Sequence, residues 1–510
     1  MKKSFVLLLT LILFISGTAC YAQNEILKEK DQVNFKETVL YGDKAVVDGV
    51  TVEMKNEYSS NLFWDSTYVI GATPKEETDY RFYAWDYNEN RYNFSGSMDF
   101  IIDCIETVGM REDYSDDEAY YGLNTAMKEL YDQTEPGTEN SITVYLKDYV
   151  DYYTFGLSLS LPEDWEDKTT DYYRYSYLWK WEVLEDISYL EETGRDKEEL
   201  KKMKAYLADL EAFHEFFKIP VLDTEVYTLA MAKDAEGNVI GTADSHMHGG
   251  SGSGEIEIPD APNVAGADSF SFRMFSAFDD GGCYFTFDPH TSNEAVVDVS
   301  LIPGGYGIYH FPYNEKDGTI NLDELKMIYP LEVNTQWESM QLDESGENLL
   351  LFTWDMEKHY LTIIDRETMT LVDTFELGAS EEYIFHWSYE DYLVVCGENL
   401  MVFPKDENGR YYKAFSVNME SINTKIEQIA TNDDMFRWDI CFDWNGETLL
   451  IAGDIQYYDE GIGRVQFACD FYVAAINATG LLYYGEYEST LEEPCRPNDD
   501  YEISVSVRWK

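Results

Sequence analysis

The chain is poor in basic side chains. Its 510 residues include 37 Lys and Arg against 98 Asp and Glu, which gives a formal net charge of −61. A surface this acidic repels phosphate backbones and anionic lipid headgroups, so it excludes free nucleic acid and membrane surfaces as favourable partners. The chain is still 45% hydrophobic, which is enough for a sizeable core and excludes a disordered acidic tail.

Long apolar segments are also scarce. Residues 5–15 are apolar apart from Thr10; they follow a basic start and precede a group of small residues. This is the layout of a secretory signal, and the run is short for a bilayer span. We therefore expect a signal peptide over residues 1–22. The mature protein is expected to be exported, extracellular or associated with the cell surface, and to have no transmembrane segment.

The point of cleavage has two interpretations. Residues 17–20 (GTAC) resemble a bacterial lipobox, in which Cys20 becomes the lipid-carrying N-terminus, although Gly17 replaces the usual Leu. A standard cleavage after Ala22 fits equally well. The first interpretation adds an N-terminal lipid anchor, and the second does not.

Cysteine is rare, and no CxxC pair occurs among the seven cysteines, which argues against a zinc site. Six remain if Cys20 is removed or lipidated. An even number in an exported protein permits disulfides, and buried free thiols are an equal alternative. The six are Cys104, Cys283, Cys396, Cys441, Cys469 and Cys495.

A repeat stands out in the second half of the chain. Residues 342–351 (LDESGENLLL) and 442–451 (FDWNGETLLI) share an apolar residue and Asp, then Gly-Glu, then an apolar run. Such a stretch forms a tight turn, with Gly where φ is positive, that leads into a buried strand. Degenerate copies occur at residues 278–285 and 388–395, and the last three copies are about fifty residues apart.

A repeat of this length has room for four strands. In the best copy we expect strands at residues 349–354, 360–365 and 370–377. Repeats of about 40–50 residues with four strands each are typical of β-propellers. The Asp-x-x-Gly-Glu-x-Leu turn resembles the hairpin of WD40-like β-propeller repeat proteins of the bacterial secreted or lipoprotein type. The resemblance covers about residues 265–510 and implies the fold, without a particular function.

The first half of the chain also contains strand-like runs. Four of them make one expected blade, at residues 45–54, 62–71, 79–86 and 91–102. A second expected blade uses residues 141–145, 153–161, 225–232 and 238–243, with a turn at 234–237. Residues 501–509 are left over as a closing strand.

Helices interrupt this pattern. Within an insertion at about residues 171–218, we expect one helix at 172–192 and a second that Asp196 caps, with Glu199 completing a capping box. A further helix is expected at 116–132, with Ser115 as its cap.

We therefore expect a mainly β protein, a β-propeller of about six to seven four-stranded blades with a helical insertion. The N-terminal blades would occupy residues 36–260 and the C-terminal blades 265–510. The alternative is an N-terminal α+β domain followed by a smaller C-terminal β domain. The Gly/Ser-rich residues 249–254 would then be a flexible linker.

Two places offer weak candidate metal ligands. His246 and His248 would face the same side of an extended strand, but no third ligand follows from their spacing. Residues from Asp317 to Glu324 resemble the second half of an EF-hand calcium loop, but Tyr313 at its first position has no carboxylate. We favour an exposed loop at the first place and a hairpin at the second. No cofactor is expected, and calcium is the one candidate ion.

Common enzyme motifs are absent: the chain has no GxSxG, no P-loop and no HExxH. We assign no catalytic residue. The favoured function is an exported, non-catalytic propeller that binds a protein, peptide or glycan. The alternative is an extracellular hydrolase that acts on glycans or cell-wall material through an Asp/Glu pair, which 98 acidic residues leave without a distinguishing position.

Overall fold

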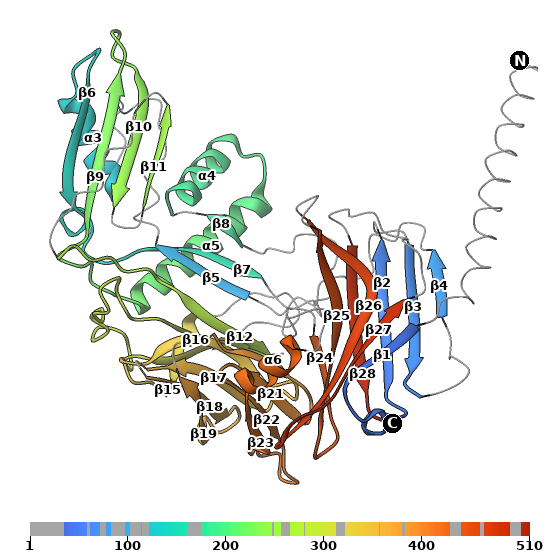
Figure 1. Cartoon of the computed structure of the whole chain (residues 1–510). Coiled ribbons are helices and arrows are strands. Elements are labelled where there is room, and N and C mark those ends of the chain that lie inside the picture. Colours follow the sequence, from blue (N-terminus) through green and yellow to red (C-terminus); the bar gives the residue numbers. More distant parts are fainter. Residues whose placement is uncertain are drawn as a thin grey trace, which may run out of the picture. The chain divides into compact units, whose positions relative to one another are not determined.

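Antiparallel β-sheets make up most of the computed structural model of the chain (Figure 1). The structure describes residues 35–58, 62–71, 78–82, 97–102, 114, 122–160, 175–178, 180–246, 249–254, 256, 266–279, 281–312, 322–355, 357–379, 383–428, 440–459, 464–489 and 501–510. The expected signal peptide and Cys20 lie outside these residues. The prediction of a mainly β protein with four-stranded antiparallel sheets is confirmed, and the sheets are consistent with propeller-like blades.

The chain forms two compact units. The terminal unit takes its described residues from Met1–Arg91 and Leu377–Lys510, and the central unit takes them from Tyr92–Glu376. The expected boundary near residues 260–265 falls within the central unit. The expected boundary divides N-terminal from C-terminal blades along the sequence, and this division stays a prediction.

Three sheets build the terminal unit. A five-stranded sheet has the order β1-β27-β26-β25-β24, where β1 is Phe35–Gly42, β24 Ile440–Trp444, β25 Leu449–Asp459, β26 Arg464–Asn477 and β27 Gly480–Ser489. A second has the order β28-β2-β3-β4, where β2 is Thr51–Tyr58, β3 Leu62–Val69, β4 Thr78–Phe82 and β28 Tyr501–Arg508. The third runs β20 to β23 in order, with β20 Phe385–Ser388, β21 Tyr392–Cys396, β22 Asn399–Pro404 and β23 Phe415–Asn418.

Strands from opposite ends of the described chain pair with each other in this unit. The strand expected at residues 501–509 is confirmed, because β28 pairs with β2 along its whole length, from Thr51 opposite Arg508 to Tyr58 opposite Tyr501. Its role in closing a propeller stays a prediction. β1 pairs likewise with β27. The apolar side chains of β2 and β28 pack with residues of β25, β26 and β27 in one buried cluster. Burial therefore stabilises the pairing in addition to the main-chain hydrogen bonds.

The central unit also has three sheets that resemble blades. One has the order β5-β7-β8, with β5 Ser97–Ile102, β7 Phe155–Ser160 and β8 Tyr175–Leu178. The next runs β12 to β15 in order: Met274–Asp279, Gly282–Phe287, Gly307–Pro312 and Lys326–Pro330. The third runs β16 to β19: Gln336–Leu342, Asn348–Trp354, Lys358–Asp365 and Thr370–Ala379. β17, β18 and β19 confirm the three strands expected in the best copy of the repeat.

Two expected blades of the first half were wrong in their pairing. β5 does not complete a sheet with β2, β3 and β4, because β28 occupies the fourth position of that sheet. β7 does not lie beside β6 (Glu139–Tyr145) either, because β6 pairs with β9 (Val226–Lys233). In both cases the correct partner lies far away in the sequence, where local strand propensity gives no information.

A fourth sheet of the central unit, which we call the inserted sheet, has the order β11-β10-β9-β6 (Figure 1). Residues 249–254, expected to be a flexible linker, instead form its strand β11 (Gly249–Gly254), which pairs with β10 (Val239–His246) from Gly254 opposite Gly241 to Gly249 opposite His246. An antiparallel ladder needs only main-chain groups, so a partner strand can order a glycine-rich segment.

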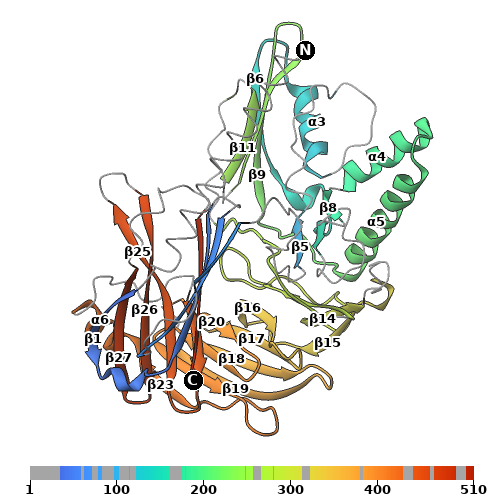
Figure 2. The same cartoon turned by 90° about the vertical axis from the view of Figure 1, so that its right-hand side faces the viewer.

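Helices accompany the inserted sheet. α3 (Leu123–Gln133) packs on β6 and β9, and the Lys233 ammonium donates to the carbonyls of Tyr131 and Thr134 at the end of α3. α4 (Lys180–Thr193) and α5 (Lys197–Phe216) lie side by side as a hairpin (Figure 2). None of the helices within the described residues has the length and apolar character needed to cross a bilayer.

The helix predictions were partly correct. Asp196 caps α5 as expected, since its carboxylate accepts from the amides of Glu198 and Glu199. The helix expected at 172–192 was wrong in its first part, where the Tyr-rich β8 precedes α4, because tyrosine favours a pleated strand. The expected start of a helix near Ser115 lies outside the described residues.

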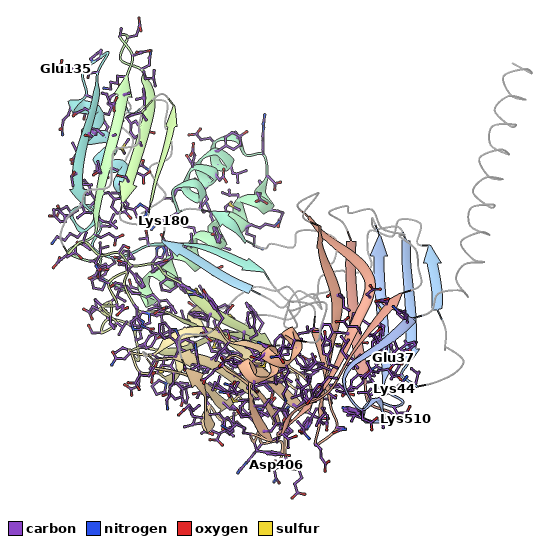
Figure 3. All side chains as sticks on the ribbon, in the orientation of Figure 1. Glu37, Lys44, Glu135, Lys180, Asp406 and Lys510 are labelled. Carbon is purple, nitrogen blue, oxygen red and sulfur yellow. The ribbon has the colours of Figure 1, made fainter. Side chains whose placement is uncertain are left out.

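Acidic residues occupy many turns. Asp343, in the repeat, is buried and accepts hydrogen bonds from the amides of Glu347 and Asn348 and from the Asn348 side chain. Gly346 and Gly446 have φ of 67° and 101°, as the repeat predicts. Asp406, at the tip of a hairpin in Figure 3, accepts from the amides of Asn408 and Arg410. Much of the negative charge therefore serves local backbone geometry.

Three polar contacts join neighbouring sheets within the units, and each involves a residue at or near the end of the first strand of a sheet. Asp279 of β12 pairs with Arg366, which follows β18. Tyr389, after β20, accepts from the Phe442 amide of β24, at 3.1 Å. Asp443 of β24 accepts from the amide of Trp509, which follows β28.

The closing strand gives a direct test of the terminal unit. Val507 of β28 is 4% exposed, so Val507→Ala is expected to lower the free energy of unfolding by about 2 kcal/mol through lost burial and a residual cavity. Urea unfolding followed by circular dichroism measures the change. Arg508→Ala is the matched control, since its surface contact with Glu53 contributes little. Equal midpoints for the two variants would contradict the sealing role of β28.

Candidate functional site

A small recess in the central unit contains the carboxyl group whose pKa is shifted furthest among the described residues. It lies where the inserted sheet meets the segment that leads into β12. Glu225, directly before β9, is 1% exposed and lies at this recess. The residues that line the recess are Glu225, Val226, Tyr227, His246, Ala267, Asp268 and Ser269.

Two tyrosines hold the Glu225 carboxyl. Tyr227 is two residues further along the extended chain, so its side chain points the same way, and its hydroxyl donates to Oε1 at 3.2 Å. The hydroxyl of Tyr153, from the segment before β7, donates to Oε2 and accepts from the Leu222 amide at 3.3 Å. Both oxygens of Glu225 are therefore engaged inside the protein.

The environment of Glu225 favours its protonated form. The pKa of Glu225 is raised from 4.5 to about 7, mainly by burial and to a smaller extent by the nearby Asp268 charge. The hydrogen bonds from Tyr153, Tyr227 and the Phe270 amide act in the opposite direction, because they stabilise the carboxylate. Desolvation wins, so the side chain binds its proton far more tightly than an exposed Glu does.

Asp268 behaves in the opposite way. Burial alone would raise its pKa, but hydrogen bonds lower the pKa of Asp268 overall. The Thr291 hydroxyl donates to Oδ2 at 2.6 Å, and the Ser292 hydroxyl donates to Oδ1 at 2.7 Å. The amides of Ser269 and Asn293 complete the set. The recess thus holds two carboxyl groups whose proton affinities differ, which is the pattern of many acid–base pairs.

The size of the recess limits its chemistry. Its volume is about 10 Å³, which is space for about one water molecule. A sugar ring or a peptide does not fit there. In this structure the carboxyl groups can exchange protons with a water but do not contact a substrate.

The candidate metal ligands do not converge. His246 lines the recess, with its ring stacked on Tyr227 at 5.3 Å between centroids. Glu324 ends the short helix η4 (Leu322–Glu324), in the hairpin between β14 and β15. His248 and Asp317 lie outside the described residues. Among the residues that the structure describes, no three His, Cys, Asp or Glu side chains are grouped as a metal site.

A second polar pair lies in the sheet of β16 to β19. The His359 ring nitrogen Nδ1 is 3.2 Å from Glu338 Oε1, and His359 is buried. Burial raises the pKa of Glu338, whereas the charges of His359 and Arg273 oppose that rise. This is a carboxyl–imidazole pair and not the pair of acids that the hydrolase alternative requires.

Cysteine provides no site in the described part of the chain. Cys283 and Cys396 are buried and Cys441 is half-buried, and burial raises the pKa of both Cys283 and Cys441. Such thiols are unreactive at neutral pH. The side chains of the other four cysteines lie outside the described residues.

The sequence does not predict the recess. Glu225 and Tyr153 begin strand-like runs, but no sequence pattern connects these residues with Asp268. The one local signal is a carboxyl group directly before an apolar strand, with a tyrosine two residues later. That signal is weak in a chain with 98 acidic residues.

Comparisons with known proteins give distant structural likenesses. No family model and no curated protein matches the chain. A candidate 6-phosphogluconolactonase from Bacteroides uniformis is 14% identical, over 53% of this chain and 72% of that one, with a TM-score of 0.22. The β-propeller domain of the Trilobed protease from Pyrococcus furiosus is 10% identical, over 51% and 67%, with a TM-score of 0.18. Likenesses this weak assign the chain to no specific family.

The carboxylate of Asp268 is expected to hold the loop at residues 291–293. Asp268→Ala leaves two hydroxyls and two amides without their acceptor, so we expect a loss of about 2–3 kcal/mol in the free energy of unfolding. Chemical denaturation measures it. Asp223→Ala is the matched control, because the Asp223 side chain is 85% exposed and pairs with Lys147 at the surface. A variant of Asp268 as stable as the control would show that the loop is held by other contacts.

Proposed function

We propose that the chain is an exported, non-catalytic β-propeller protein that binds a protein, peptide or glycan. The binding role rests on one observation: both carboxyl groups at the recess accept hydrogen bonds from donors within the protein. Asp268 has four hydrogen-bond donors inside the protein, and Glu225 has three, including the Phe270 amide. A hydrolase needs a carboxyl pair that faces a substrate, and these carboxyls face their own chain.

In this proposal the sheets other than the inserted sheet are the blades. Three features support it: four-stranded antiparallel sheets in sequence order at β12–β15, β16–β19 and β20–β23, contacts between the first strands of neighbouring sheets, and completion of the sheet of β2, β3 and β4 by the late strand β28. In the central unit β12 touches both β5 and β16, and in the terminal unit β24 touches β28. First strands that lie side by side are the arrangement of inner strands in a propeller.

The inserted sheet and its helices are the proposed ligand-binding element. This part of the chain has exposed apolar side chains: Tyr145, Tyr152, Leu184, Tyr189 and Ile240 are each at least 39% exposed. Aromatic side chains with carboxylates nearby suit sugar faces and cationic peptides. A net charge of −61 favours uncharged or cationic ligands over anionic ones.

The binding role is tested with the purified mature chain on arrays of glycans and of basic peptides, with product analysis of every ligand that binds. Saturable binding without turnover is expected, and Tyr189→Ala is expected to weaken it about tenfold, a typical cost for an exposed aromatic contact. Glu236→Ala, in the exposed turn between β9 and β10, is the control. Product formation that Glu225→Gln abolishes would instead establish the hydrolase alternative at the recess.

Export is tested separately by mass spectrometry of the mature N-terminus after expression of the full chain in a bacterial host with a lipoprotein pathway. Either a lipid-modified Cys20 or cleavage after Ala22 is expected. A mature chain that retains residues 1–22 would refute the signal peptide. The Cys20→Ser variant distinguishes the two cleavage modes, since it blocks lipidation and leaves a standard cleavage intact.

A further inference from the structure

Glu225 occupies a junction of several chain segments. Its carbonyl accepts from the Leu146 amide at 3.0 Å, where β6 ends, and β9 starts at the next residue. Its side chain contacts Tyr153, from the segment before β7, and the Phe270 amide, from the segment before β12. The neighbouring Thr224 carbonyl accepts from the Asp268 amide at 3.3 Å. One carboxyl thus connects the inserted sheet with two of the blade-like sheets of the central unit.

The titratable groups around this carboxyl come from each segment packed on it. They are Tyr153 before β7, Tyr227 on β9, His246 on β10 and Asp268 before β12. Among the described residues that line the recess there is no Lys or Arg, and His246 is the one side chain of that set that can carry a positive charge. Once the imidazole is neutral, a charge on Glu225 lies beside the Asp268 charge with no described cation at the recess to balance it.

Loss of the proton has a structural consequence at this place. A buried carboxylate without a cation is stabilised by water, and the recess has room for about one water molecule. Further hydration requires the segments around Glu225 to move apart. The buried surroundings and the Asp268 charge disfavour a charged carboxyl, and the hydrogen bonds from Tyr153, Tyr227 and the Phe270 amide offset only part of that cost.

We propose that Glu225 is a proton-dependent latch, which keeps the inserted sheet fixed to the segment before β12 while the carboxyl is protonated and releases it when the proton is lost. The inference is independent of the ligand proposed above. It assigns a regulatory role to the junction: the inserted sheet is held rigidly in acidic surroundings and loosely in neutral to alkaline surroundings.

The direction of the pH dependence follows from the two protonation states. Burial raises the pKa of Glu225 to about 7 in the closed junction, and in an opened, hydrated junction the pKa returns toward 4.5. The closed form therefore binds the proton more tightly. Its advantage is complete below pH ~4.5, declines as the pH rises toward 7 and is constant above that value. For full opening, the opening constant increases about thirtyfold between pH 5.5 and 8.5.

Hydrogen exchange of the intact mature chain, measured by mass spectrometry from pH ~5.5 to ~8.5 and corrected for intrinsic exchange rates, tests the latch. Peptides that cover residues 146–155, 222–230 and 266–272 are expected to lose protection by about thirtyfold, levelling off above pH ~7. Glu225→Gln keeps the shape of the side chain and cannot ionise, so its protection in these peptides is expected to be independent of pH. Glu236→Gln, an exposed position on the same sheet, is the matched control and is expected to behave like the unmodified chain.

A second variant keeps the test decisive if Glu225→Gln does not fold. The Tyr227 hydroxyl stabilises the carboxylate form, so Tyr227→Phe is expected to move the midpoint of the protection change to higher pH. A purely structural contact would lower protection equally at every pH and leave the midpoint in place. The latch is overturned if the unmodified chain shows constant protection, if Glu225→Gln retains the change, or if Tyr227→Phe leaves the midpoint unmoved.

Discussion

The packing of one sheet on the next is the constraint on which each compact unit depends. A four-stranded sheet has two apolar faces and cannot bury either of them alone. Apolar clusters between neighbouring sheets supply most of the favourable free energy, but they are not directional. The Asp279–Arg366 pair, the bond from the Phe442 amide to Tyr389 and the bond from the Trp509 amide to Asp443 fix where one sheet lies on the next. Burial and polar alignment thus have separate tasks, and the polar contact determines the register of the packing.

Local patterns predicted the local part of this fold. The Asp-Gly turn of the repeat and the apolar runs after it correspond to β17 and β25, and the Asp196 cap marks the start of α5, because turn and cap chemistry involves residues only a few positions apart. Pairing across long sequence distances was not predictable in the same way. The sequence around residues 97–102 is strand-like, but nothing in it distinguishes β7 from β4 as a partner. Likewise the glycines of β11 have no strand propensity, and β10 orders them through main-chain bonds alone.

The recess around Glu225 illustrates why a site of this kind escapes sequence reasoning. Several of the described acidic residues serve turns, as Asp406 and Asp234 do. Glu225 differs from them only through what packs on it, and its partners Tyr153 and Asp268 come from other segments of the central unit. The candidate ligands that sequence spacing did suggest share no such packing: His246 reaches the recess as an aromatic neighbour of Tyr227, and Glu324 lies in a hairpin elsewhere. The candidate site in this chain is therefore defined by tertiary contacts and not by a sequence motif.

The pairing of the two ends of the described chain has a consequence for the order of events in biosynthesis. Lys36 and Glu488, which pair at 2.7 Å across β1 and β27, are 452 residues apart in the sequence. The central unit is a continuous segment and can fold as soon as it emerges, whereas β1 and β2 must wait for β27 and β28, which are made much later. Until then the early strands present unpaired edges, and charged side chains such as Lys36, Glu37 and Glu53 oppose association through those edges. Because its strands pair over such long sequence distances, we expect the terminal unit to form more slowly than the central unit.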